Sequence, residues 1–454
     1  MEMREYLDQV TGQMRCKKAR DMVAQELKDH IEDQAETYEN FGLCREEALN
    51  RAVEQMGDPI EVGTAMDRIH RPRINYRMIG CIALFTLFGM LMQLMMLQSA
   101  AQIGFGELLR EYRSDVLEIC VSGMSGFGIM LLVMFLDYSF LGKHPLAVWT
   151  GILLMFFVAG LLEINFYSLG LNNTNISVIT SLLTLFFAAL VYQYRNKRYR
   201  GIFLCLLWLF AGCFLLLRQS GISSACVMCL FLTGVMIISF SVQKGWFGVA
   251  KGKGQLLLWS TWMIPAISLA VALAAGIIGA TYQTMRIRYF LNPSLEPSGG
   301  SYMTLFMRNR LRGLHLVGNS LKDQENVWWY SLNYILERYG ILMGVLVLAA
   351  LALLLGSMLS GVTKQQNRLG SLLGVGCVSY LAVTTLLHLL ASLTLIPATS
   401  AYLPFFTGGR NATMGLYLLL GVYLSVYRNS MILPEKKNQA KKRLRLQVED
   451  VNPN

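Results

Sequence analysis

The chain has 454 residues, of which 54% are hydrophobic and 15% charged, with a mean hydropathy of +0.43 and a net charge of +11. Soluble domains carry about 25% charged residues, so this composition excludes an ordinary soluble enzyme. Apolar runs of roughly 20 residues recur, which is typical of an all-α polytopic membrane protein. Topology explains the basic excess, which lies mostly in short loops and the tail, so we expect no nucleic-acid partner.

The first 72 residues predict a soluble helical domain. Its apolar stripe is Val23, Leu27, Ile31, Ala35 and Tyr38. This spacing of three or four residues predicts one amphipathic helix, and residues 44–56 predict a second. Gly57 predicts the end of the second helix. Asp58 then predicts the N-cap of a third helix, and Pro59 its first residue; this helix ends before Pro72.

This segment resembles the HAAS, or permease-prefix, domain of bacterial membrane proteins. The residues that carry the likeness include Glu26-Leu27, His30-Ile31, Asp33, Met56-Gly57-Asp58-Pro59 and His70-Arg71-Pro72. The resemblance implies a cytoplasmic regulatory or docking unit with a cytosolic partner that the sequence leaves unidentified. No metal site is expected here, since Glu26, His30 and Asp33 are better explained as a solvated face.

Ten membrane spans are predicted in a domain over residues 73–430. The apolar runs cover about 78–98, 117–136, 146–167, 175–193, 201–217, 222–242, 256–280, 331–359, 370–396 and 411–427. Lys and Arg accumulate in alternate loops and in the tail, 431–454, so both termini are expected in the cytoplasm of a bacterial cell. Cys226 and Cys229 lie within an apolar run, where helix packing explains them better than a metal.

The loop over residues 281–330 breaks this charge rule. Its cations are Arg286, Arg288, Arg308, Arg310, Arg312 and Lys322. Positive charge on the outer side predicts an anionic ligand, since Arg forks suit pyrophosphate or carboxylate. Anchoring to acidic lipid headgroups is the alternative. Pro293 and Pro297 predict an ordered elbow on the membrane surface.

Ionisable residues inside spans are rare enough to mark function. Glu337 and Arg338 lie near the start of the predicted eighth span, and His388 lies in the ninth. Glu337 is the strongest candidate of the three for a catalytic role, and an ion pair with a neighbouring helix would also explain it. For His388, a hydrogen bond between helices is the simpler interpretation.

Residues 78–430 resemble the FtsW/RodA/SpoVE (SEDS) family. The run 135–141 looks like the family's hydrophobic-D-Y-x-F-L, and the run from Gln219 to Ala225 is similar to Q-P-D-L-G-T-A. Residues 288–302 parallel R-x-x-F-L-D-P-x-x-D-P-x-G-x-G-Y, with Glu296 at an acidic place. The segment 397–409 looks like the family's V-T-G-x-P-L-P-F-x-S-Y-G-G-S-S.

The resemblance implies a ten-span protein of the plasma membrane that polymerises lipid-linked peptidoglycan precursor during division, elongation or sporulation, beside a class B penicillin-binding protein. A sugar hydroxyl attacks an anomeric carbon as a lipid pyrophosphate leaves, which needs a carboxylate base and positive charge. The family's proposed catalytic aspartate corresponds to Trp329 here, so Asp323 or Glu325 is the expected substitute. The substrate-binding candidates are Arg286, Arg288, Glu296, Arg308, Arg310, Arg312, Lys322 and Gln219. No cofactor is certain; a divalent cation could accompany the pyrophosphate.

Two further hypotheses are consistent with the sequence. The chain could be a catalytically silent relative that binds the precursor or a penicillin-binding protein. It could also transport the lipid-linked precursor across the bilayer. Turnover of purified precursor would favour an enzyme over a catalytically silent relative. A cavity through the bilayer would favour transport.

Overall fold

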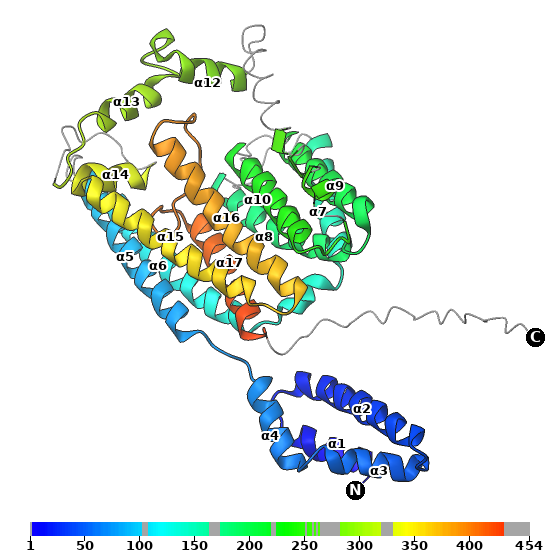
Figure 1. Ribbon diagram of the computed structural model, residues 1–454. Helices are drawn as coiled ribbons and strands as arrows, with labels where there is room; N and C mark the ends of the chain where they lie inside the picture. The colour runs from blue at the N-terminus through cyan, green and yellow to red at the C-terminus, as the bar shows by residue number, and fades with distance from the viewer. Residues whose placement is uncertain are drawn as a thin grey trace, which may run out of the picture. The chain divides into compact units, whose positions relative to one another are not determined.

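The computed structural model describes residues 2–101, 108–162, 173–218, 224–249, 252–256, 258–259, 262–263, 282–318 and 330–430. They divide into two compact units, with the boundary between Arg71 and Pro72. Within the described ranges every regular element is a helix, as Figure 1 shows. The predicted all-α class is therefore confirmed.

Four helices form the N-terminal unit. They are α1 (Met3–Gly12), α2 (Lys17–Asn40), α3 (Arg45–Gln55) and α4 (Pro59–Ile69). The predicted stripe from Val23 to Ala35 is buried against α1 and α3, and the Asp58 carboxylate accepts the Glu61 amide proton as the expected N-cap. Helix α1 was not predicted from the sequence, and its buried Tyr6 and Val10 complete this core.

The second unit contains the membrane helices. They are α5 (Tyr76–Ala101), α6 (Leu108–Phe135), α7 (Pro145–Leu161), α8 (Asn173–Gln193), α9 (Arg198–Arg218), α10 (Ser224–Gln243), α15 (Ile341–Thr363), α16 (Arg368–Ser392) and α17 (Arg410–Arg428), with a short helix η1 (Tyr138–Gly142) after α6. Of the described helices, six are long and apolar enough to cross a membrane, and three shorter ones are also apolar. The predicted seventh span, 256–280, lies almost entirely outside the described residues. The chain is a multi-pass membrane protein.

Helix α16 lies at the centre of this bundle. In α16, 78% of the residues in the apolar window are buried, against 22% in α6. It packs against α8, α10, α15 and α17, while α6 packs against α5 and α17 (Figure 1). Outer helices such as α15 expose leucines, for example Leu346 and Leu353. Lipid-facing side chains explain this exposure, because lipid tails are as apolar as leucine.

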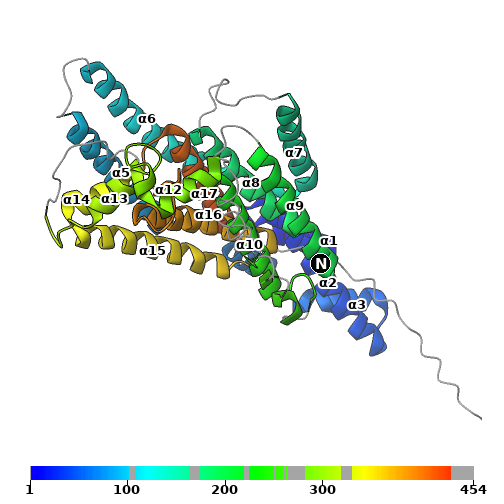
Figure 2. The same ribbon diagram turned by 90° about the horizontal axis from the view of Figure 1, so that it is seen from above.

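A lid, defined here as residues 282–318, lies over one end of the bundle in both views (Figures 1 and 2). It consists of α12 (Tyr282–Leu291), the short helix η2 (Pro293–Leu295) and α13 (Tyr302–Leu311). Pro293 opens η2, where its fixed φ suits the first turn of a helix. The predicted ordered elbow is therefore present between α12 and α13.

The predicted eighth span, 331–359, is wrong in its boundaries. The structure divides it into a nine-residue helix, α14 (Ser331–Tyr339), and the spanning helix α15. Gly340 separates them with φ of +92°, a conformation that residues with a side chain rarely adopt. Glu337 and Arg338 therefore lie on α14, outside the spanning helix. The predicted run bridged the break because Leu332, Ile335 and Leu336 of α14 lie next to the apolar residues of α15 in sequence.

Replacing Gly340 with alanine is expected to destabilise the protein. The left-handed φ costs about 1–2 kcal/mol for a residue with a Cβ. In addition, that Cβ would lie 2.6 Å from the Leu316 carbonyl oxygen and 2.7 Å from the Val317 Cα, both backbone atoms that cannot easily move. Thermal unfolding in detergent should show a lower midpoint than for Gly356→Ala, where an added Cβ meets nothing within 4 Å. Equal midpoints would contradict this account.

Candidate functional site

The segment between α16 and α17 forms one wall of the candidate site. Phe405 has φ of +71°, a strained value for a residue with a side chain. Its carbonyl oxygen accepts a 2.8 Å hydrogen bond from the Gln93 side chain, and its ring stacks on Phe85 at 5.4 Å between centroids. Strained backbone persists only where its surroundings hold it. Helix α5 supplies that support through Phe85 and Gln93.

Gly89 lets α5 approach this segment. A Cβ at this position would lie 2.3 Å from the Phe405 carbonyl oxygen and 2.8 Å from its carbonyl carbon. We expect Gly89→Ala to displace residues 402–409 and to destabilise the protein by about 1–3 kcal/mol, as overpacking does. The measurement is thermal unfolding beside Gly80→Ala, a change in the same helix with nothing within 4 Å of the new Cβ. Equal unfolding midpoints for Gly89→Ala and Gly80→Ala would mean that residues 402–409 can be displaced without loss of stability.

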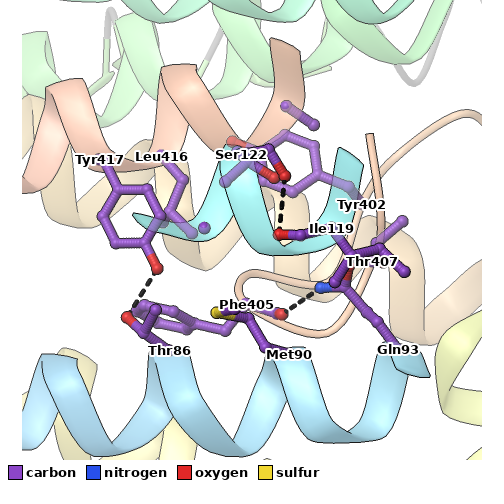
Figure 3. Close-up of a pocket in the computed structure, with 13 residues that line it drawn as sticks. Thr86, Met90, Gln93, Ile119, Ser122, Tyr402, Phe405, Thr407, Leu416 and Tyr417 are labelled. Carbon is purple, nitrogen blue, oxygen red and sulfur yellow. Dashed lines mark hydrogen bonds between the residues drawn. The ribbon is translucent and has the colours of Figure 1, made fainter. Parts of the chain in front are cut away.

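A narrow pocket lies behind this wall, between α5, α6 and α17 (Figure 3). The hydroxyl of Tyr417 donates to Thr86 Oγ1 at 2.6 Å, and Ser122 Oγ donates to the Ile119 carbonyl at 3.1 Å. The pocket volume is about 10 Å³, enough for about one water. Seven of its thirteen lining residues carry a hydroxyl or an amide, although it lies among membrane helices.

A larger cavity of about 290 Å³ adjoins the narrow pocket and shares Gln93, Ile119, Ser122 and Thr407 with it. Asp115 and Glu118 of α6 line one side of this cavity. Ser331, the first residue of α14, lines it together with the segment from Phe406 to Gly409. Two carboxylates, an amide and three hydroxyl-bearing side chains therefore border one space at the end of the bundle that carries α14.

This lining has a definite chemical capacity. Asp115 and Glu118 are three residues apart, so they share a helix face and can accept a proton or hold a cation. Hydroxyl and amide groups such as Ser331, Thr407 and Gln93 can bind the hydroxyls of a sugar. Among the described residues there is no group of three or more His, Cys, Asp or Glu placed to hold a metal. Oxygen atoms of a diphosphate would therefore have to complete a cation site here.

The predicted arginines of the lid have separate environments. Arg286 donates to the Ala398 carbonyl, which ties α12 to the segment after α16. Arg308 donates to the Phe290 carbonyl at 3.4 Å and lies over the Phe290 ring. Arg288 and Arg312 are exposed. No described lid residue of the predicted set lines the cavity.

Of the other predicted residues, Glu296 is exposed, and Gly300 N–H donates to its carboxylate at 3.4 Å. A hydrogen bond from Tyr289 to Glu296 raises the pKa of that tyrosine. Four predicted residues, together with Trp329, lie outside the described residues: Gln219, Lys322, Asp323 and Glu325. Their roles stay predictions.

Arg310 and Glu337 bind each other. Arg310 Nη1 lies 2.6 Å from Glu337 Oε2, and the two side chains are only 13% and 5% exposed. The Arg310 guanidinium also lies 4.3 Å from the centre of the Phe306 ring. Burial raises the pKa of Glu337, and the neighbouring Arg310 opposes that rise. The alternative that the sequence left open for Glu337, an ion pair with another helix, is what the structure shows.

Sequence reasoning missed the cavity carboxylates. Asp115 and Glu118 lie beside the start of the predicted span 117–136, where charged residues commonly mark the end of a membrane helix. Their spacing of three residues at the start of a span was the available signal. Nothing in the local sequence indicates that Gln93, more than 200 residues before Ser331, shares a cavity with it.

Comparison with known proteins identifies the family. The profile of the FtsW/RodA/SpoVE family, described as "Cell cycle protein", matches residues 76–432. The chain belongs to this family. A chain in the solved structure entitled "Structural coordination of polymerization and crosslinking by a peptidoglycan synthase complex" covers 79% of this chain and 98% of its own length, with a TM-score of 0.57 at 17% identity. That likeness shows the shared fold.

Two curated relatives match a part of the chain. "Probable peptidoglycan glycosyltransferase FtsW" of Enterococcus hirae is 28% identical over 172 residues, covering 36% of this chain and 42% of that protein. "Stage V sporulation protein E" of Bacillus subtilis is 25% identical over 162 residues, covering 34% of this chain and 44% of that protein. The chain thus matches less than half the length of these relatives.

Proposed function

We propose that this protein is a divergent peptidoglycan glycosyltransferase that acts on lipid-linked precursor at the outer leaflet of the bacterial plasma membrane. The observation that carries the proposal is the cavity of about 290 Å³, where Asp115 and Glu118 face a wall with the hydroxyls of Ser331 and Thr407. Membership of the FtsW/RodA/SpoVE family and the names of the matched relatives support it.

The proposed reaction joins two lipid-linked sugars. A hydroxyl of the acceptor sugar attacks the anomeric carbon of the donor, a new glycosidic bond forms, and the bond to the lipid diphosphate breaks. Asp115 or Glu118 accepts the hydroxyl proton, and the diphosphate leaves with the bonding electron pair. Asp323 and Glu325 are the alternative bases that the sequence predicts.

Positive charge near the leaving diphosphate comes from two sources. Arg288 and Arg312 are exposed on the lid; neither lines the cavity, so they would act on the diphosphate from outside the reacting centre. Helix α17 begins at Arg410, and its N-cap residue Gly409 lies in the cavity wall and provides no side-chain cap, so the first amides of the helix carry partial positive charge. Asp115 and Glu118 would help to hold a divalent cation, which would stabilise the negative charge of the leaving diphosphate.

Orientation and partners form part of the proposal. The lid end of the bundle faces outward, and both termini lie in the cytoplasm, as the alternation of loop charge predicts. The N-terminal unit is a HAAS-like regulatory domain that binds an unidentified cytosolic partner. A class B penicillin-binding protein is the proposed outer partner; the peptidoglycan synthase complex named above supports this choice.

The test is polymerisation of purified lipid II by the full-length protein in detergent or nanodiscs, with and without a class B penicillin-binding protein. Glycan strands longer than the precursor are the expected product. A lack of strands under both conditions, together with retained binding of lipid II, would overturn the enzymatic proposal.

That negative result would favour the second candidate, a catalytically silent relative that binds the precursor. Two observations support this candidate: Trp329 occupies the place of the family's proposed catalytic aspartate, and Glu337 is engaged by Arg310. A tryptophan cannot accept a proton, so only a substitute carboxylate would allow catalysis.

A further inference from the structure

Helix α14 connects the lid to the cavity. Its residues from Ser331 to Glu337 are all buried, although three of the seven are polar or charged. A rise of about 1.5 Å per residue places Glu337 about 9 Å along the helix axis from Ser331. One end of a short rigid helix therefore meets the lid while the other lines the cavity.

The lid end is held by side chains and by backbone. The 2.6 Å ion pair joins Arg310 of α13 to Glu337. Beside it, Ile341 N donates to the His315 carbonyl at 3.0 Å, and Leu342 N donates to the Leu316 carbonyl at 3.1 Å. The close approach at Gly340 allows this pairing. These contacts fix the lid to α14 and to the first residues of α15.

The cavity end is held by hydroxyl groups. Ser331 Oγ and Thr407 Oγ1 lie 3.0 Å apart, and Thr407 Oγ1 also accepts from Leu403 N at 2.8 Å. One residue earlier, the Tyr330 hydroxyl donates to the Thr399 carbonyl at 3.2 Å and accepts from the Thr399 amide at 3.0 Å. The position of α14 thus sets the position of the wall segment 399–407.

We propose that Arg310 and Glu337 are positioning residues, which hold α14 so that the Ser331–Thr407 hydroxyl pair forms the wall that receives the hydroxyls of a substrate sugar. The identity of the substrate in this inference rests on the proposed function. Through α14 the lid would set the position of the cavity wall, although its arginines do not touch the reacting atoms. A misplacement of about 1 Å in such a wall can cost about 10²-fold in rate.

The first measurement does not need activity. Hydrogen–deuterium exchange of the full-length protein is compared for wild type, Arg310→Ala, Glu337→Ala and Asn309→Ala, the last being an exposed neighbour of Arg310 on α13. We expect residues 331–339 and also residues 402–409 to exchange faster than in wild type in both Arg310→Ala and Glu337→Ala. In Asn309→Ala both segments should exchange at the wild-type rate. A purely local structural role would affect 331–339 and leave 402–409 unchanged, and that result would overturn the proposal.

The second measurement uses lipid II turnover. We expect kcat/KM to fall about 10–100-fold in Arg310→Ala, mainly through kcat, and to recover partly in the charge-swapped double variant Arg310→Glu/Glu337→Arg. Glu337→Gln, which keeps the shape and can still accept a hydrogen bond, covers the case in which Glu337→Ala does not fold. Wild-type kcat/KM in both Arg310→Ala and Glu337→Gln would contradict the inference. If wild type itself is inactive, the exchange result still decides this inference, and only the proposed function fails.

Discussion

Replacing Asp115 with asparagine is expected to lower the rate of glycan polymerisation by about 10²–10⁴-fold, the usual contribution of a general base. The asparagine keeps the size and shape of the aspartate but loses its negative charge and its ability to accept a proton. Binding of lipid II should change little in the same variant. The assay is strand formation from lipid II by equal amounts of folded protein.

The matched variants separate the possible bases. Glu118→Gln tests the second cavity carboxylate, and Asp323→Asn and Glu325→Gln test those that the sequence predicts. Glu296→Gln is the control for an exposed carboxylate on the lid, away from the cavity. Full activity in both Asp115→Asn and Glu118→Gln, with loss of activity in Asp323→Asn, would show that the general base lies in residues 319–329, at Asp323, and not in the cavity.

Breaking the Arg310–Glu337 ion pair is expected to have the largest effect on stability among the changes considered. Glu337→Ala leaves a guanidinium at 13% exposure without its carboxylate, and removal of one partner of a buried pair costs about 3–5 kcal/mol. Arg310→Ala should cost less, because Glu337 can take up a proton once alone and burial already raises its pKa. Arg310 in the Glu337→Ala variant cannot become neutral in this way, because an arginine does not lose its proton in a protein.

Thermal unfolding in detergent at constant lipid content measures this difference. The double variant Arg310→Met/Glu337→Leu should recover most of the lost stability, because it leaves no buried charge. A loss in the double variant as large as the sum of the two single losses would show that the pair does not interact in the folded protein.

Several sequence-based expectations were confirmed for a shared reason. The six described helices able to cross a membrane, the amphipathic stripe of α2 and the cap at Asp58 depend on residues close together in the chain, so local pattern suffices. The boundary error at Gly340 arose because apolar residues of the short helix α14, among them Leu332, Ile335 and Leu336, precede the spanning helix α15 directly, and an apolar run by itself does not show the break between them.

The order of the residues alone determined that this chain crosses a membrane many times, that a helical domain precedes the spans and that a cationic segment interrupts them. Only the tertiary structure decided which charges meet and which groups share a space. Arg310 pairs with Glu337 across 27 positions, and Gln93 bonds to Phe405 across 312. Hydropathy and helix signals act over a few residues, whereas these contacts exist only after packing has brought distant segments together.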